Sequence, residues 1–119
     1  MPVFWRIRGE QWAALMGDRL EAFADRAVPF LRGEAPEVVE DASDDEVREL
    51  ALRAAKRGVS LGFEDAYCLQ QLVLFVAWYG EELFDAPWAR RVLEQPSTPE
   101  LTKVARLEDY LLTRWEGAR

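Results

Sequence analysis

The sequence contains no histidine and a single cysteine, Cys68, among its 119 residues. Histidine is the side chain whose ordinary pKa lies closest to neutral pH. Its absence excludes Ser-His-Asp and Cys-His nucleophilic sites, Cys/His zinc sites and Glu-x-x-His di-iron sites. A lone cysteine excludes an internal disulfide framework and is typical of a reducing compartment. Because Cys68 lies in an apolar stretch without a basic neighbour, we expect it to be a buried core residue.

Long uncharged apolar stretches are also missing, since no window approaches the roughly 18 residues of a membrane-spanning helix. The N-terminus has no basic segment followed by an apolar one, so we expect no signal peptide and a cytoplasmic protein. The sequence has neither a glycine-rich phosphate loop nor the alternating acidic residues and glycine of a calcium loop. We therefore expect no cofactor and no metal ion.

These absences leave a group of carboxylates as the remaining route to catalysis. Glu81, Glu82 and Asp85 are close in sequence, and one hypothesis is a hydrolase that uses them. The alternative, which we favour, is that they form a solvated helix end. We accordingly expect a protein that is not an enzyme and has no catalytic residue.

Isoleucine occurs once and valine is scattered, so the β-branched runs of a βαβ fold are absent. Apolar residues instead recur at three- and four-residue steps, which predicts helices. We expect helices over about residues 9–31, 43–57, 62–79, 87–95 and 97–115. Residues 1–8 alternate loosely and predict an extended arm. The fold class that follows is all-α: one small domain over residues 1–119, built of about five helices in an orthogonal bundle.

Local signals set the expected helix ends. Ser43 with Glu46, and Ser97 with Glu100, have the spacing of a capping box. Gly58 follows a basic last turn, as the residue after a helix often does. The third expected helix carries no charge along most of its length, which predicts that it lies at the centre of the bundle.

The formal net charge of −7 arises from one segment of the chain. Residues 34–49 hold eight acidic residues and one basic residue, Arg48, whereas the rest of the chain is balanced. One interpretation is a solvated loop and a helix start whose acids match the helix dipole. The other is a docking surface for a basic protein. Its candidate residues are Glu37, Glu40, Asp41, Asp44 and Asp45.

The same acidic segment argues against two other classes of partner. Carboxylates repel the phosphates of nucleic acids and the head groups of anionic membranes. We therefore expect no nucleic-acid and no membrane partner.

Five tryptophans are many for a chain of this length. Trp12, Trp78 and Trp115 fall on apolar helix stripes, so we expect them in the core. Trp5 and Trp88 lie in the arm and beside a loop, where aromatic anchors of interfaces often occur. Packing against the chain's own body is the interpretation that we favour for each of the two, and contact with a partner is the other. A further hypothesis is a self-associating structural subunit in which the apolar arm packs on a neighbouring copy.

The order of several short motifs carries a family resemblance. Residues 21–26 precede Phe30-Leu31-Arg32, a later helix closes on Arg57-Gly58-Val59, and residues 80–85 lead to Pro87-Trp88-Ala89. In this order, over most of its length, the chain resembles small uncharacterised α-helical proteins of proteobacterial and myxobacterial gene clusters for type VI secretion and polymorphic toxins. The resemblance implies a non-enzymatic accessory that binds a toxin or effector, either as an immunity protein or as an adaptor. It implies no catalytic residue.

Overall fold

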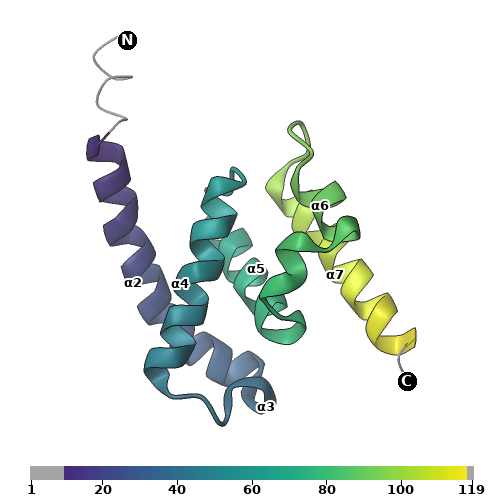
Figure 1. Ribbon diagram of the computed structural model, residues 1–119, viewed down its shortest axis with the longest axis horizontal. Helices are drawn as coiled ribbons and strands as arrows, with labels where there is room; N and C mark the ends of the chain where they lie inside the picture. Colours follow the sequence, from purple (N-terminus) through teal and green to yellow (C-terminus); the bar gives the residue numbers. More distant parts are fainter. Residues whose placement is uncertain (1–9, 118–119) are drawn as a thin grey trace.

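The computed structural model describes residues 10–117, and the side chains of residues 17–113. This part of the chain is helical and contains no strand (Figure 1). Its elements are α2 (Glu10–Glu34), α3 (Pro36–Val39), α4 (Asp44–Ser60), α5 (Ala66–Tyr79), η1 (Glu81–Asp85), α6 (Pro87–Leu93) and α7 (Glu100–Gly117). The all-α fold expected from the sequence is confirmed. The expected arm over residues 1–8, with Trp5, lies outside the described residues.

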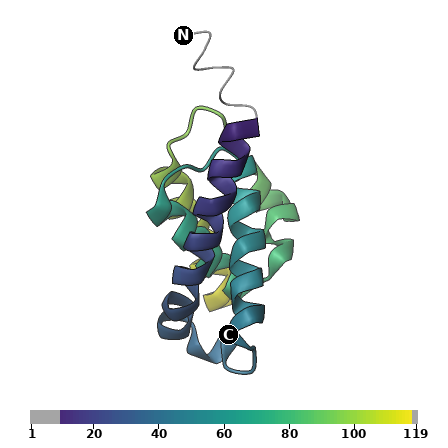
Figure 2. The same cartoon turned by 90° about the vertical axis from the view of Figure 1, so that its left-hand side faces the viewer.

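The helices are arranged side by side, with α5 in the middle. α2 packs against α4, α4 packs against α5, and α5 packs against α7, while α6 and η1 connect α5 to α7. Figures 1 and 2 show α2 and α7 on opposite sides of the molecule. The shortest dimension is 20 Å, about two helix diameters, so most helices keep one face toward solvent. None of the helices in residues 10–117 has the length and apolarity required to cross a membrane.

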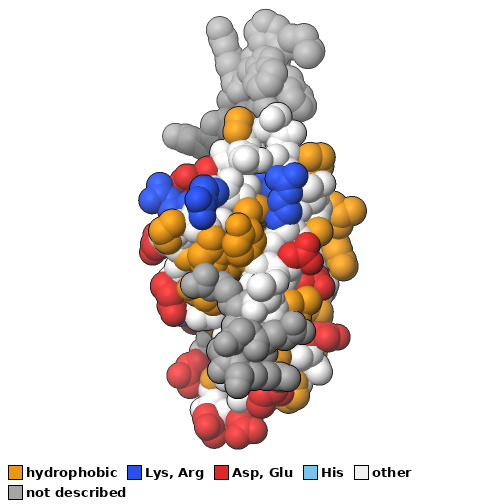
Figure 3. Space-filling model, turned by 90° about the vertical axis from the view of Figure 1, so that its right-hand side faces the viewer, with side chains coloured by type: hydrophobic (Ala, Val, Ile, Leu, Met, Phe, Trp, Pro, Cys, Tyr) orange, Lys and Arg blue, Asp and Glu red, His pale blue; other side chains and the backbone are white. Residues whose placement is uncertain are grey.

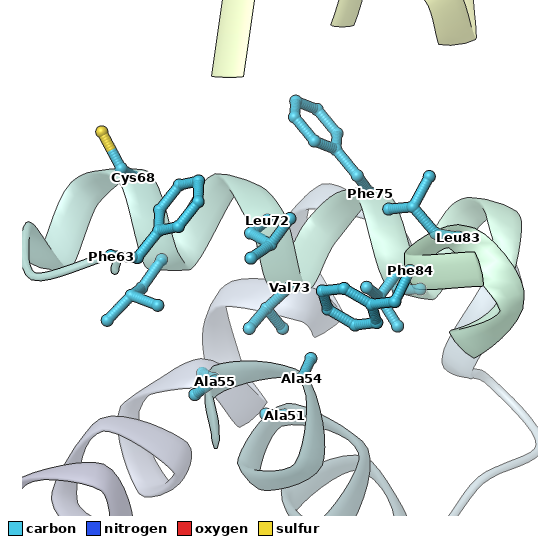
Figure 4. Packing of buried hydrophobic residues seen from close by; sticks show 14 of the residues in the cluster. Ala51, Ala54, Ala55, Phe63, Cys68, Leu72, Val73, Phe75, Leu83 and Phe84 are labelled. Atoms are coloured by element: carbon cyan, nitrogen blue, oxygen red, sulfur yellow. The ribbon is translucent and has the colours of Figure 1, made fainter. Parts of the chain in front are cut away.

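The core receives side chains from all the helices, and Figure 4 shows the part that lies around α5. Ala51, Ala54 and Ala55 of α4 are buried, and their small size allows Leu72 and Val73 of α5 to approach closely. Each residue from Ala66 to Tyr79 is uncharged, in agreement with the expected central position of this helix.

Gly58 is part of this close packing, so the prediction that it follows the helix is wrong. It lies inside α4 and is buried. A Cβ atom at this position would lie 2.7 Å from Leu69 Cδ2 and 2.9 Å from Leu72 Cδ2. The helix instead ends at Ser60, and Gly62 adopts the left-handed conformation with a φ of 96°. A glycine is therefore required at position 58 because α5 packs closely against it, and not because the helix ends there.

Of the two expected capping boxes, the first is confirmed. The Ser43 hydroxyl accepts from the backbone N–H of Glu46, and the Glu46 carboxylate accepts from the backbone N–H of Ser43. The second is wrong. Glu100 accepts from the backbone N–H groups of Glu64 and Asp65, at 3.0 and 3.1 Å, and so connects the start of α7 to the entrance of α5.

Other boundaries also differ from the expected ones: α5 begins at Ala66 and not near residue 62, and α7 begins at Glu100 and not at residue 97. α2 continues through Pro29 to Glu34 instead of ending near residue 31. The acidic residues at 81–85 belong to a separate 3₁₀-helix, η1, because Gly80 has a φ of 113° and ends α5. Leu83 and Phe84 bury this short helix against the core.

Candidate functional site

The five acidic residues predicted as a docking surface lie together at one end of the molecule. Glu37 belongs to the short helix α3, Glu40 and Asp41 to the turn after it, and Asp44 and Asp45 to the first turn of α4. All five are exposed. We call this set of five residues the acidic end. Figure 3 shows acidic side chains gathered at the lower end of the molecule.

A single arginine, Arg32 on α2, connects the backbone segments of the acidic end. Its guanidinium donates to the backbone oxygen of Val39, to the backbone oxygen of Ala42 at 2.7 Å and to Asp44 Oδ1 at 2.8 Å. These bonds join α2 to the end of α3, the following turn and the start of α4. The sequence analysis did not predict this role of Arg32, although an arginine directly before a long acidic segment could have indicated it.

The acidic end keeps most of its negative charge unpaired. Asp44 is the one member that forms an ion pair with a described residue, Arg32. The carboxylates of the other four are exposed. Val38, 39% exposed, adds an apolar side chain on α3 beside them. An exposed apolar side chain next to exposed carboxylates suits a partner surface that is basic and contains apolar side chains.

The start of α4 is stabilised by the ionised form of Glu46. The backbone N–H of Ser43 donates to this carboxylate, and that hydrogen bond, followed by the one to the Ser43 side chain, lowers the pKa of Glu46. Next to it, Arg48 donates to Asp25 Oδ1 at 2.6 Å and ties α4 to α2. The α4 part of the acidic end therefore belongs to a helix start that is held by its capping box and by the bond between Arg48 and Asp25.

Trp88 is a core residue: it packs against the chain's own body, as one of the two interpretations expected, and is not exposed as an interface anchor would be. Its side chain is 6% exposed. The ring packs edge-on against Tyr79, with 5.7 Å between centroids, and stacks on Tyr110 at 5.1 Å. Pro87 starts α6 so that its apolar edge turns inward, and Trp88 joins α5, α6 and α7. The other predicted anchor, Trp5, lies outside the described residues.

The three carboxylates of the hydrolase hypothesis have exposed surroundings. Arg53 donates to Glu81 at 2.8 and 3.3 Å, and this hydrogen bond lowers the pKa of Glu81. Asp85 is 77% exposed and lies 3.9 Å from Arg57. A general acid requires a raised pKa, which is opposite to the shift at Glu81. Within the described part of the chain, no group of three or more acidic or cysteine side chains is arranged to hold a metal ion.

A second surface feature lies between α5 and α7, and the sequence did not indicate it. It is an open cavity of about 390 Å³, which we call the α5–α7 groove. Its described lining residues are Gln71, Leu74, Phe75, Trp78, Tyr79, Glu108, Leu111 and Leu112. Figure 3 shows hydrophobic side chains gathered on the side of the molecule that carries α7.

No protein-family model, no curated protein and no solved structure matches this chain.

Proposed function

We propose that the chain is a non-enzymatic accessory that binds a basic protein through its acidic end. The observation that carries this proposal is the fixed presentation of exposed carboxylates by three backbone segments that Arg32 holds together. Local helix-dipole matching accounts for Asp44 and Asp45 in the first turn of α4. The same matching applies to Glu37 in the first turn of α3, but not to Glu40 and Asp41, which lie in the turn between the two helices.

Such a surface acts by electrostatic steering and by orientation. Clustered carboxylates attract a basic partner over roughly a Debye length, about 8–10 Å at physiological salt, and raise the association rate. Because Arg32 already fixes the backbone, less conformational entropy is lost when a partner docks. Arginine and lysine side chains of the partner would pair with the four carboxylates that lack an ion pair to a described residue.

The family resemblance supports a toxin or effector of a bacterial type VI secretion or polymorphic-toxin cluster as the partner. A nuclease toxin with a basic substrate groove fits the acidic end, since carboxylates can occupy positions that phosphates of the substrate would take. In that role the chain is a cytoplasmic immunity protein that covers the groove, or an adaptor that holds the toxin for export.

The test begins with co-purification of the chain with the products of neighbouring genes. Association rates with a captured partner are then measured at low and high salt. Two variants of equal charge change are compared. The first reverses acids of the acidic end: Glu37→Lys, Glu40→Lys, Asp41→Lys and Asp45→Lys. The control reverses exposed acids elsewhere: Asp18→Lys, Glu21→Lys, Glu82→Lys and Asp109→Lys.

We expect the first variant to slow association at low salt by at least about tenfold and to flatten its salt dependence. The control variant changes the net charge equally but leaves the acidic end intact, so its effect should be much smaller. Equal effects of the two variants, or no effect of either, would contradict docking at the acidic end.

A further inference from the structure

A lysine, Lys103, is buried near the start of α7. Its side chain is 6% exposed, and its ammonium donates to the backbone oxygen of Leu93 at 2.9 Å. The nitrogen also lies 5.9 Å from the centroid of the Phe63 ring. None of the ion pairs among the described residues includes it. Lysine side chains are almost never buried to this extent without a carboxylate partner, so the position of Lys103 requires an explanation.

Burial of this ammonium weakens the docking of α7 against the rest of the molecule. An ammonium has three N–H donors, and the carbonyl oxygen of Leu93 accepts from one of them. A carbonyl oxygen and an aromatic ring near the distance limit of a cation–π contact do not replace the counter-ion that a buried charge needs. Solvent in the open cavity beside Lys103 reaches little of the side chain, because so little of it is exposed. Full hydration of the ammonium returns only when α7 moves away.

α7 lies at one edge of the molecule. Its main contacts are with α5 and α6, whereas α2 and α4 pack against each other and against α5. Figure 1 shows α7 on the side opposite α2. Val104 and Leu107 are its buried apolar side chains among the described residues, and Glu100 connects it to the entrance of α5. α7 can therefore separate without breaking the packing among α2, α4 and α5.

The side of α5 that α7 covers carries Cys68 and Phe75. Both side chains are buried, as the sequence analysis expected of Cys68. Figure 4 shows them on the side of α5 that points away from Ala51 of α4. Desolvation, followed by the negative charges of Asp65 and Glu100, raises the pKa of the Cys68 thiol to about 11. Because Glu100 is the first residue of α7, the thiol lies close to this helix, and opening of α7 would expose it.

We propose that α7 is a detachable cover of α5, which opens as a unit while α2, α4 and α5 stay folded. The charge of Lys103, which has no counter-ion among the described residues, keeps the docking of α7 weak. Opening exposes Cys68 and Phe75 to solvent. Structural units of this kind open with a free energy below that of global unfolding. The cover is separate from the acidic end, so this proposal does not depend on the proposed function.

Alkylation of Cys68 by iodoacetamide in the full chain, at increasing urea concentrations, tests the proposal. Cys68 is the only cysteine of the chain, so the reaction reports on one position. When α7 closes faster than the thiol reacts, the rate measures the population of the open state. We expect a free energy of opening below that of global unfolding, which circular dichroism measures in the same solutions. It should also depend less on urea, because less surface is exposed. Equal free energies with equal urea dependence would overturn the proposal.

The variant Lys103→Met tests whether the buried charge weakens the docking of α7. Methionine keeps an unbranched apolar side chain and removes the ammonium, so α7 should open less often and alkylation of Cys68 should slow by at least about fivefold. Arg106→Met is the matched control, because it removes one positive charge from the exposed side of the same helix. Its alkylation rate should stay within about twofold of that of the unchanged chain. Faster alkylation of the Lys103→Met chain would show that the bond to Leu93 strengthens docking, and would overturn the proposal.

The variant Val47→Ala distinguishes opening of α7 from unfolding of the whole chain. Val47 is buried in α4, and its truncation should lower the free energy of global unfolding. If α7 opens alone, the alkylation rate of Cys68 without urea should stay within about twofold of that of the unchanged chain. An alkylation rate that rises in proportion to the lost global stability would overturn the proposal, because the thiol would then be reached only through global unfolding.

Discussion

At the scale of single residues, Arg32 shows how one side chain can organise a surface that the sequence describes only by its charge. Its guanidinium satisfies the carbonyl oxygens of Val39 and Ala42 and pairs with Asp44. The contact is non-local, since the sequence separation reaches 12 residues. The acidic residues can be located by counting charges along the sequence. The arginine that holds their backbone segments together cannot, because its partners are distant in sequence.

Replacing Arg32 by alanine should destabilise the chain and loosen the acidic end. We expect Arg32→Ala to lower the free energy of unfolding by about 1–2 kcal/mol, because partly buried carbonyl groups lose their donor. Arg32→Lys should recover only part of this, since an ammonium lacks the planar fork that bridges several acceptors. Urea denaturation measures both, with Arg91→Ala as an exposed control. Equal stability of all three variants would contradict the role of Arg32.

At the scale of helices, features that depend on residues within one turn were predicted better than features that depend on contacts between helices. The capping box of Ser43 and Glu46 formed because both partners lie within one turn. The same spacing failed at Ser97, because Glu100 accepts from backbone groups of the α5 entrance, 35 and 36 residues away. Trp88 and the α5–α7 groove depend on which helices meet, and periodicity within a helix carries no such information.

The contact between α4 and α5 gives a prediction at this scale. Gly58→Ala should lower the free energy of unfolding by about 1–3 kcal/mol, because the added methyl group overlaps Leu69 and Leu72. Gly17→Ala in α2 is the matched control. It has no atom within 4 Å of the added carbon, so helix propensity should stabilise it by about 0.5–1 kcal/mol. Thermal denaturation of both variants should therefore show shifts of opposite sign. A stabilised Gly58→Ala chain would show that α4 and α5 are not closely packed.

The start of α4 gives a pH-dependent prediction. The pKa of Glu46 is lowered in the folded state, so its contribution to stability is present above its ordinary carboxyl pKa and is lost as the pH falls through the lowered value. The stability difference between the native chain and Glu46→Ala should therefore shrink as the solution is acidified. Urea denaturation at a series of pH values measures it. Glu49→Ala, on the same helix but outside the cap, should show a much smaller trend; a constant difference for Glu46→Ala would contradict the capping role.

At the scale of the whole molecule, the acidic end and the α5–α7 groove lie on different elements. The acidic end belongs to α3, the turn after it and the start of α4, whereas the groove belongs to α5 and α7. α5 touches α3 as well as α4, but no described side chain belongs to both the acidic end and the groove. Changes at distant sites without shared partners are usually additive.

Combining substitutions from the two surfaces tests this separation. Leu112→Glu, in the α5–α7 groove, should leave the association rate of a basic partner within about twofold of the native value. A chain that carries both sets of substitutions should show only the defect of the acidic-end variant, with the size that it has alone. Stopped-flow association measures both rates. Slower association of the Leu112→Glu chain would show that the acidic end alone is an incomplete binding surface.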